Sequence, residues 1–144
     1  MRVVDANVLL YAVNEDARHH KSSRTWLDHA LGGADTVGLS WLVLLAFVRL
    51  STKPGLFADP LGVDEALDQV QAWIAAPGAV VVGPGPSHAD ILRRTLIDVG
   101  AGGNLVNDAH LAAVALEHHA DIVSYDNDFS RFTGVRWRTP DALL

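Results

Sequence analysis

Short apolar runs that alternate with segments of helical periodicity constrain the fold of this chain more than any other feature. The runs are rich in β-branched residues and end at glycines or polar side chains, which predicts strands over residues 3–4, 36–39, 79–82, 121–124 and 135–137. Apolar residues spaced by three and four predict helices over residues 8–12, 18–31, 41–50, 63–74, from about 87, and from 104 or 107 to 118. This alternation is typical of a parallel sheet with helices on both faces.

The starts of the helices carry recognisable capping residues. Asn7 is expected to cap the helix over residues 8–12, and Ser40 the helix over residues 41–50. Ser87, with Asp90 three residues later, resembles a capping box. The proline and glycine clusters lie between such elements, so we expect residues 1–144 to form a single domain.

Composition excludes several classes of site. The chain has no cysteine, so disulfides, thiolate metal sites and cysteine nucleophiles are ruled out. Its net charge of −6, from 17 acidic and 11 basic side chains, disfavours a general nucleic-acid binder, because phosphate affinity comes mostly from lysine and arginine. Asp5 lies where a signal peptide needs apolar residues, and the apolar run over 37–48 is too short to cross a bilayer. We therefore expect a cytoplasmic protein with no membrane contact.

Four aspartates occupy the positions where ligands bind in a parallel α/β fold, beyond the carboxyl ends of the strands. Asp5 ends the first strand, while Asp126 and Asp128 follow the strand over residues 121–124. Asp108 lies in the first turn of the preceding helix and shares a face with apolar neighbours. If these carboxylates converge, their repulsion requires a divalent cation, and oxygen-only ligands favour Mg²⁺, with Mn²⁺ as the second choice.

Each of these aspartates also has an ordinary explanation. Asp5, Asp126 and Asp128 are common turn residues, and Asp108 suits the dipole at a helix N-terminus. The joint placement of all four at the sites that the fold rule selects favours a shared cation site. A divalent cation in such a site can activate water for phosphodiester hydrolysis.

Four stretches of the sequence together resemble the PIN domain family and, more closely, the VapC-type toxins of toxin–antitoxin pairs. They are residues 4–10 (VDANVLL), 40–50 (SWLVLLAFVRL), 103–113 (GNLVNDAHLAA) and 122–129 (IVSYDNDF). The resemblance implies a PIN-like three-layer α/β/α sandwich with a central parallel sheet. It also implies a magnesium- or manganese-dependent endoribonuclease, whose substrates in VapC toxins are often transfer RNA or ribosomal RNA.

The resemblance assigns roles to individual residues. Asp5, Asp108 and Asp126 would be the catalytic, metal-binding carboxylates, and Asp128 would support them or bind a second ion. Asn7 and Ser40 would hold the pocket by hydrogen bonds, and Arg49 would contact a phosphate or pair with a neighbouring acid. Many PIN domains have a glutamate at the position that Ala46 occupies here, and its loss should weaken the site for a second ion.

Three functions follow as hypotheses. The leading one is a ribonuclease toxin that a cognate VapB-type antitoxin holds inactive, with the apolar helix surfaces serving a homodimer and the antitoxin. The second is an aspartate-based phosphohydrolase or phosphoacceptor with Asp5 as nucleophile, although residues 5–7 lack the second aspartate of the usual pair. The third is a PIN-fold module that only binds RNA or protein, which Ala46 favours.

Overall fold

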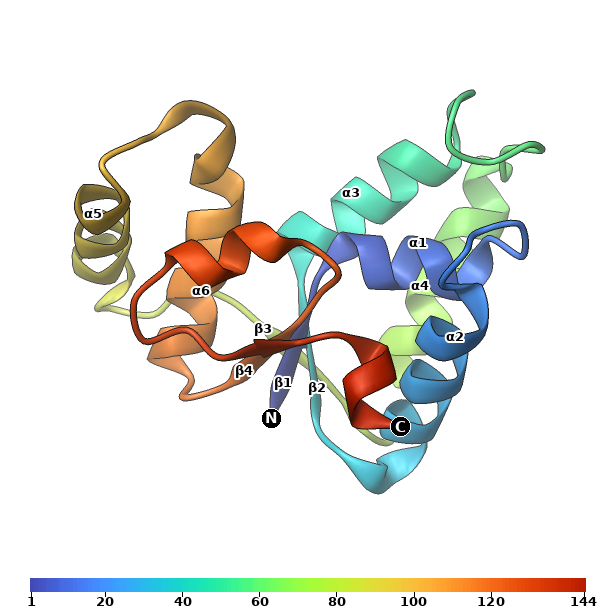
Figure 1. The fold of residues 1–144 in the computed structure, drawn as a ribbon. Coiled ribbons are helices and arrows are strands. Elements are labelled where there is room, and N and C mark those ends of the chain that lie inside the picture. The colour runs from blue at the N-terminus through green and yellow to red at the C-terminus, as the bar shows by residue number, and fades with distance from the viewer.

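A five-stranded parallel sheet forms the centre of the computed structural model, which describes residues 1–144 (Figure 1). The strands are β1 (Arg2–Val4), β2 (Val37–Ser40), β3 (Ala79–Val82), β4 (Asp121–Val123) and β5 (Trp137–Arg138). They lie in the order β3-β2-β1-β4-β5, and every neighbouring pair is parallel. The predicted α/β class is confirmed, and all five carboxyl ends meet at one edge, with β1 in the middle.

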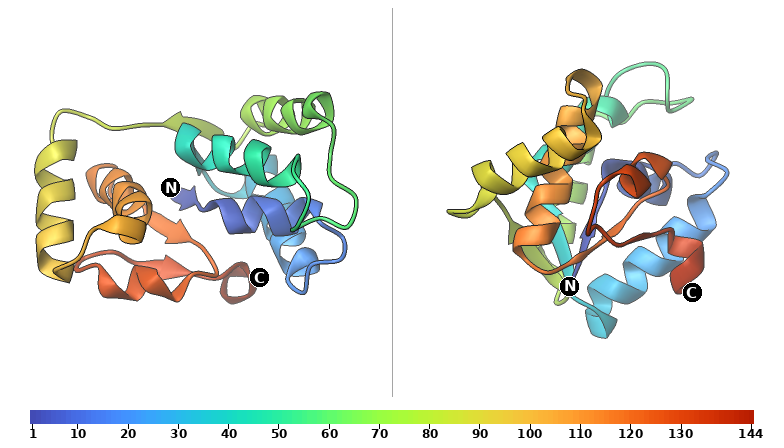
Figure 2. Two further views of the ribbon diagram at one scale, coloured as in Figure 1. Left: turned by 90° about the horizontal axis from the view of Figure 1, so that it is seen from above. Right: turned by 60° about the vertical axis from the view of Figure 1, so that its left-hand side comes forward.

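Helices cover both faces of this sheet. They are α1 (Ala6–Val13), α2 (His20–His29), α3 (Trp41–Ser51), α4 (Val63–Ala75), α5 (His88–Val99) and α6 (Val106–Glu117). Figure 2 shows α5 and α6 on one side of the strands and α1 to α4 on the other, which is the expected three-layer arrangement. None of these helices has the length and apolar character that crossing a membrane demands.

The helix starts differ in detail from the sequence-based expectation. Asp5, not Asn7, is the N-cap of α1, because its carboxylate accepts a hydrogen bond from the Ala6 backbone N–H at 2.7 Å. Ser40 and Ser87 do occupy N-cap positions, but neither side chain makes a capping hydrogen bond. The cap at Asp5 moves the start of α1 to the strand end and leaves the Asn7 side chain available for tertiary contacts.

The core is continuous and surrounds the central strand. One cluster of 30 buried residues includes Val3 and Val4 of β1, both with no exposed surface. Gly38 lies beside them in β2, and a Cβ there would come within 3.1 Å of a Val3 methyl group. Helix α6 is buried over most of its surface, and the small side chains of Ala109 and Ala112 allow it to lie close to β1 and β4. This close packing places the first turn of α6 at the carboxyl edge of the sheet.

Candidate metal centre and its surroundings

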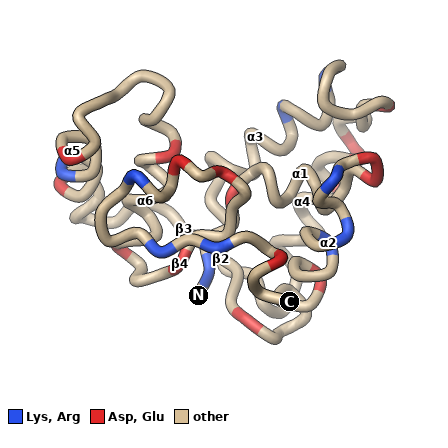
Figure 3. The backbone as a smooth tube through the Cα atoms, viewed as in Figure 1, with Lys and Arg blue, Asp and Glu red and all other residues tan.

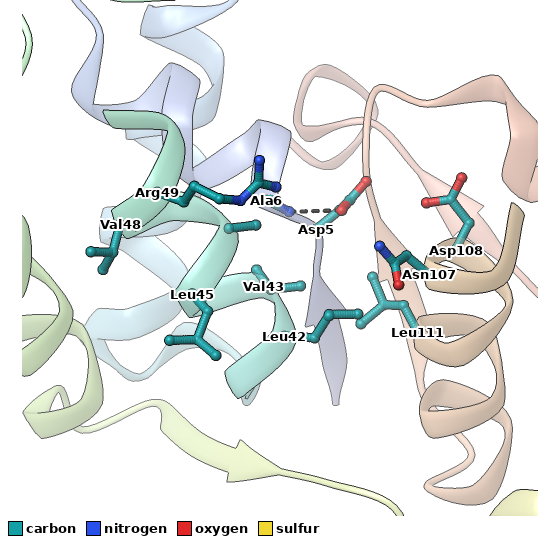
Figure 4. A pocket seen from close by; sticks show the side chains of 11 residues that line it. Asp5, Ala6, Leu42, Val43, Leu45, Val48, Arg49, Asn107, Asp108 and Leu111 are labelled. Atoms are coloured by element: carbon teal, nitrogen blue, oxygen red, sulfur yellow. Dashed lines mark hydrogen bonds between the residues drawn. The ribbon is translucent and has the colours of Figure 1, made fainter. Parts of the chain in front are cut away.

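The four aspartates of interest all lie at the carboxyl edge of the sheet. Asp5 directly follows β1, and Asp126 and Asp128 follow β4 in the turn that begins the short helix η3 (Asn127–Arg131). Asp108 projects from the first turn of α6 toward this edge, as the close-up view in Figure 4 shows. The fold therefore brings together residues that are more than 100 positions apart in the sequence.

Asp5 is held by hydrogen bonds on both carboxylate oxygens. Its Oδ1 accepts from the Ala6 N–H, and its Oδ2 accepts from the Ser124 hydroxyl at 2.6 Å and from the Asn7 amide at 3.0 Å. Burial raises the pKa of Asp5 above its ordinary value, the hydrogen bond from Ser124 opposes that rise, and the charge of Asp126 adds to it. These contacts fix the orientation of the carboxylate before any ligand binds.

Ser124 is the central hydrogen-bonding residue of this network. Besides donating to Asp5, its Oγ accepts from the Asn7 amide at 3.1 Å and from the Asp126 backbone N–H at 2.9 Å. Asn7 also accepts from the Tyr125 N–H at 3.2 Å, which ties the end of β1 to the end of β4. Ser124 is fully buried, so these hydrogen bonds have no competition from water.

Three carboxylates form a tight group next to this network. Oxygen atoms of Asp108, Asp126 and Asp128 lie within 4.8 Å of one another. At an effective dielectric constant of about 20, two unit charges at this separation repel by about 3 kcal/mol. Desolvation, followed by the charges of Asp126, Asp5 and Asp128, raises the pKa of Asp108 to about 6.

The donor set of this group fits a hard divalent cation. Metal–oxygen distances in Mg²⁺ sites are about 2.1 Å, so opposite ligands of one ion lie about 4.2 Å apart. The observed spacing of up to 4.8 Å among the three carboxylates is compatible with one shared ion. An ion would also offset the mutual repulsion that, after desolvation, adds to the rise in the pKa of Asp108. The absence of sulfur or imidazole in the group disfavours softer metals.

A groove of about 670 Å³ opens beside the carboxylates, between α3 and α6 (Figure 4). Asp5 and Asp108 line it together with apolar side chains of α3. Ala46 also lines the groove, so a glutamate at this position would add a carboxylate beside the other acids. Arg49 extends from α3 toward Asp5 in Figure 4, and it forms no ion pair with any acidic side chain.

Tyr125, between Ser124 and Asp126, anchors this edge to the rest of the molecule. Its hydroxyl donates to Asp141 at 2.6 Å, and its ring stacks on His19 with the centroids 4.0 Å apart. Burial, followed by the hydrogen bond to Asp141, raises the pKa of Tyr125 to about 12. The backbone that carries Asp126 is thus fixed from both sides.

The structure groups some of the predicted site residues and separates others. Asp108, Asp126 and Asp128 come together, with Asp5 beside them and Asn7 bonded to Asp5 as expected. Ser40 is buried at the end of β2, makes no side-chain hydrogen bond and does not line the groove.

Ser124 and Tyr125 were not among the predicted site residues. The available signal was their place between a buried strand and an acidic turn, where the fold rule already pointed.

Comparison with known proteins places the chain among characterised relatives. A family model described as the PIN domain matches residues 2–135. The chain is 65% identical to Ribonuclease VapC37 of Mycobacterium tuberculosis (strain ATCC 25618 / H37Rv) over 144 residues, which covers all of both chains. It is 41% identical over 140 residues to Ribonuclease VapC43 of the same strain, covering 97% of this chain and 95% of that protein.

Solved structures share the fold at low sequence identity. VapBC2 from Rickettsia felis, solved bound to a DNA fragment from its promoter, matches with a TM-score of 0.70 and 18% identity over 96% of this chain and 97% of that one. VapC20 of M. tuberculosis, a toxin that cleaves the sarcin–ricin loop, matches with a TM-score of 0.68 and 16% identity over 94% and 99% of the two chains.

Proposed function

The chain belongs to the PIN domain family and, within it, to the VapC ribonucleases, and on that premise we propose that it is a toxin that cleaves RNA as a divalent-metal-dependent endoribonuclease. The observation that carries the proposal is the group of three carboxylates within 4.8 Å at the carboxyl edge of the sheet. The proposal treats residues 1–144 as one PIN domain, which the single core cluster supports.

The carboxylates supply the metal site in this proposal. Asp108, Asp126 and Asp128 would hold the ion, and Asp5 would complete the catalytic set from the adjacent strand end. Mg²⁺ is the preferred ion, with Mn²⁺ as the alternative, because all the donors are carboxylate oxygens. When bound, the ion supplies a water of lowered pKa and neutralises phosphate charge during phosphodiester hydrolysis.

The other residues of the proposed site hold the Asp5 carboxylate in place or contact the RNA. Asn7 and Ser124 keep the Asp5 carboxylate in one orientation through their hydrogen bonds. Arg49 has no acidic partner and lines the groove, so its guanidinium is available to a phosphate of the RNA strand. The hydrogen-bonding role expected for Ser40 is not part of the proposal, because its buried side chain makes no hydrogen bond.

The proposed partners follow from the groove and the exposed apolar surface. VapBC relatives are toxin–antitoxin complexes, and a VapB-type antitoxin is the partner we assign to this chain. Leu45 is 60% exposed at the groove, and an apolar antitoxin segment that covers it would also block access to the carboxylates. Trp41 on α3 and Val80 on the edge strand β3 leave further apolar surface for a homodimer. We propose transfer or ribosomal RNA as the substrate and, accordingly, the cytoplasm as the compartment in which the protein acts.

The experiment is a cleavage assay on the isolated chain. End-labelled structured RNA is incubated with Mg²⁺, Mn²⁺ or EDTA, using the wild type, Asp5→Asn, Asp108→Asn and, as a matched control, Asp98→Asn on the exposed face of α5. We expect metal-dependent cleavage that both site variants lose and the control retains. Cleavage that persists in EDTA, or in Asp108→Asn, would contradict the proposal.

A second function is favoured by one observation, the alanine at position 46, which leaves the groove one carboxylate short of the usual PIN set. A PIN-fold module that binds RNA without cutting it is the corresponding candidate. Tight RNA binding by the wild type with no cleavage in either metal would favour it. A phosphorylated Asp5 after incubation with a small phosphodonor would instead favour the phosphohydrolase.

A further inference from the structure

Two unpaired arginines flank the carboxylate group on the side of β5. Arg131 is the last residue of η3, the short helix that Asp126 caps at its other end. Arg138 is the last residue of β5, the edge strand next to β4. Both side chains are exposed, and neither forms an ion pair or a side-chain hydrogen bond.

The strand register places Arg138 at the same edge as the acids. Arg138 pairs with Val123, and its backbone oxygen accepts a hydrogen bond from the Ser124 N–H at 3.0 Å. Ser124 in turn bonds to Asp5 and Asp126, so the Arg138 backbone is bonded directly to the central residue of the network that holds the acids. Arg138 therefore lies at the end of the strand next to β4, whose own end leads into the acidic turn, and Arg131 lies five residues after Asp126.

The segment that carries them differs in charge from the rest of the chain. Residues 129–140 contain three arginines and no acidic side chain, in a protein whose net charge is −6. The third, Arg136, is paired with Asp121 at 2.7 Å and is not free for another anion. Figure 3 shows basic positions along the C-terminal stretch that passes β4, with acidic positions on the loop above it.

We propose that the exposed face of residues 129–140, through Arg131 and Arg138, binds the phosphate backbone of the RNA strand whose scissile bond lies at the carboxylates. This inference rests on the proposed function and extends it to the path of the substrate. A carboxylate group repels a polyanion, so RNA needs local cations on the flanks of the site to approach it. Unpaired cations thus lie on three elements near the acids, Arg49 on α3, Arg131 on η3 and Arg138 on β5.

An acidic protein segment could also pair with Arg131 and Arg138. Their position next to the proposed cleavage site favours RNA over such a segment. Both arginines follow the acidic turn in the chain, near the site at which RNA must lie to be cut, and neither of them lines any of the four main pockets. A bound RNA strand that spans the carboxylates must continue past at least one flank.

The test is the salt dependence of RNA binding, measured without cleavage. Fluorescently labelled bulk transfer RNA is titrated with Asp108→Asn protein, and with the same protein carrying Arg131→Ala and Arg138→Ala, across a series of salt concentrations. The matched control removes the same charge from α5, through Arg93→Ala and Arg94→Ala, both exposed. We expect the test pair to weaken binding and to lower the slope of log Kd against log salt by about 1.4 to 1.8, since each phosphate contact contributes about 0.7 to 0.9.

Three outcomes decide the matter. An unchanged slope in the test pair overturns the proposal, and so does an equal loss in both pairs, because net charge alone would then explain it. Loss of antitoxin co-purification with unchanged RNA binding overturns it in favour of an acidic protein segment. Arg131→Lys with Arg138→Lys should restore most of the slope, which separates lost charge from lost folding. Failure of the cleavage assay would overturn the nuclease proposal while leaving this binding result readable.

Discussion

Replacing the buried Ser124 by alanine should destabilise the metal-free protein by about 3 kcal/mol. The variant loses a hydrogen bond to the charged Asp5, worth about 1.5–3 kcal/mol, and leaves the Asp126 N–H without its partner, at about 1–3 kcal/mol. The side chain has no exposed surface, so water does not replace the lost contacts directly. Because the turn can relax in the variant, we expect a loss of stability near the lower end of the sum of these two ranges.

Urea unfolding followed by circular dichroism in EDTA measures this loss. With a slope of about 2 kcal/mol/M for a chain of this size, the midpoint should fall by about 1.5 M. The matched control is Ser130→Ala in the adjacent helix η3, whose exposed hydroxyl donates to the Asn127 carbonyl oxygen at 2.7 Å, and we expect a change below about 1 kcal/mol. If the two variants lose equal stability, the reasoning about the network is refuted.

Three further perturbations test the site. Metal-free Asp108→Asn should be more stable than the wild type at pH 8. The pKa of Asp108 in the folded protein, about 6, exceeds the ordinary value of 3.8, so ionisation of this carboxylate lowers the stability of the fold. The cost grows as the pH rises above about 4 and is complete above about pH 6. Discounted for its partial exposure, the gain should be about 1–2 kcal/mol in urea unfolding and should vanish below about pH 4; a loss at pH 8 would contradict it. Ala46→Glu should tighten Mn²⁺ binding severalfold in calorimetry, because the residue lines the groove beside the acids, and unchanged affinity would place its carboxylate elsewhere. Leu45→Asp should abolish co-purification with the antitoxin, because it puts a charge on the apolar surface that the antitoxin segment covers, whereas a retained complex would move the contact off α3.

Local sequence patterns predicted most of the architecture. Residues 79–82 and 121–124 are short, β-branched and bounded by turns, and both form strands of the parallel sheet. The apolar spacing from residue 63 predicted a helix, and α4 begins there. The fold class and the PIN family were both confirmed, because hydrophobic periodicity and the order of the four matching stretches are properties of the linear chain.

The sequence also predicted which acids to consider, through the rule that ligands bind at the carboxyl ends of parallel strands. That rule selects an edge of the sheet and carries no information about distances. The three carboxylates within 4.8 Å, with Asp5 beside them and bound by hydrogen bonds, became visible only in the folded chain.

Capping and hydrogen-bond partners depended on tertiary structure. Asp5 and Asn7 are both good N-cap residues, and local propensity did not distinguish them. The choice of Asp5 follows from the end of β1, and it releases Asn7 to bond with Ser124 and Tyr125, which lie more than 100 residues away in the sequence. The amino-acid sequence alone thus determined the elements and the types of residue at their ends, since these follow from short-range sterics and periodicity. The tertiary structure decided which polar atoms meet, because that depends on how far apart the packed core holds the strand ends.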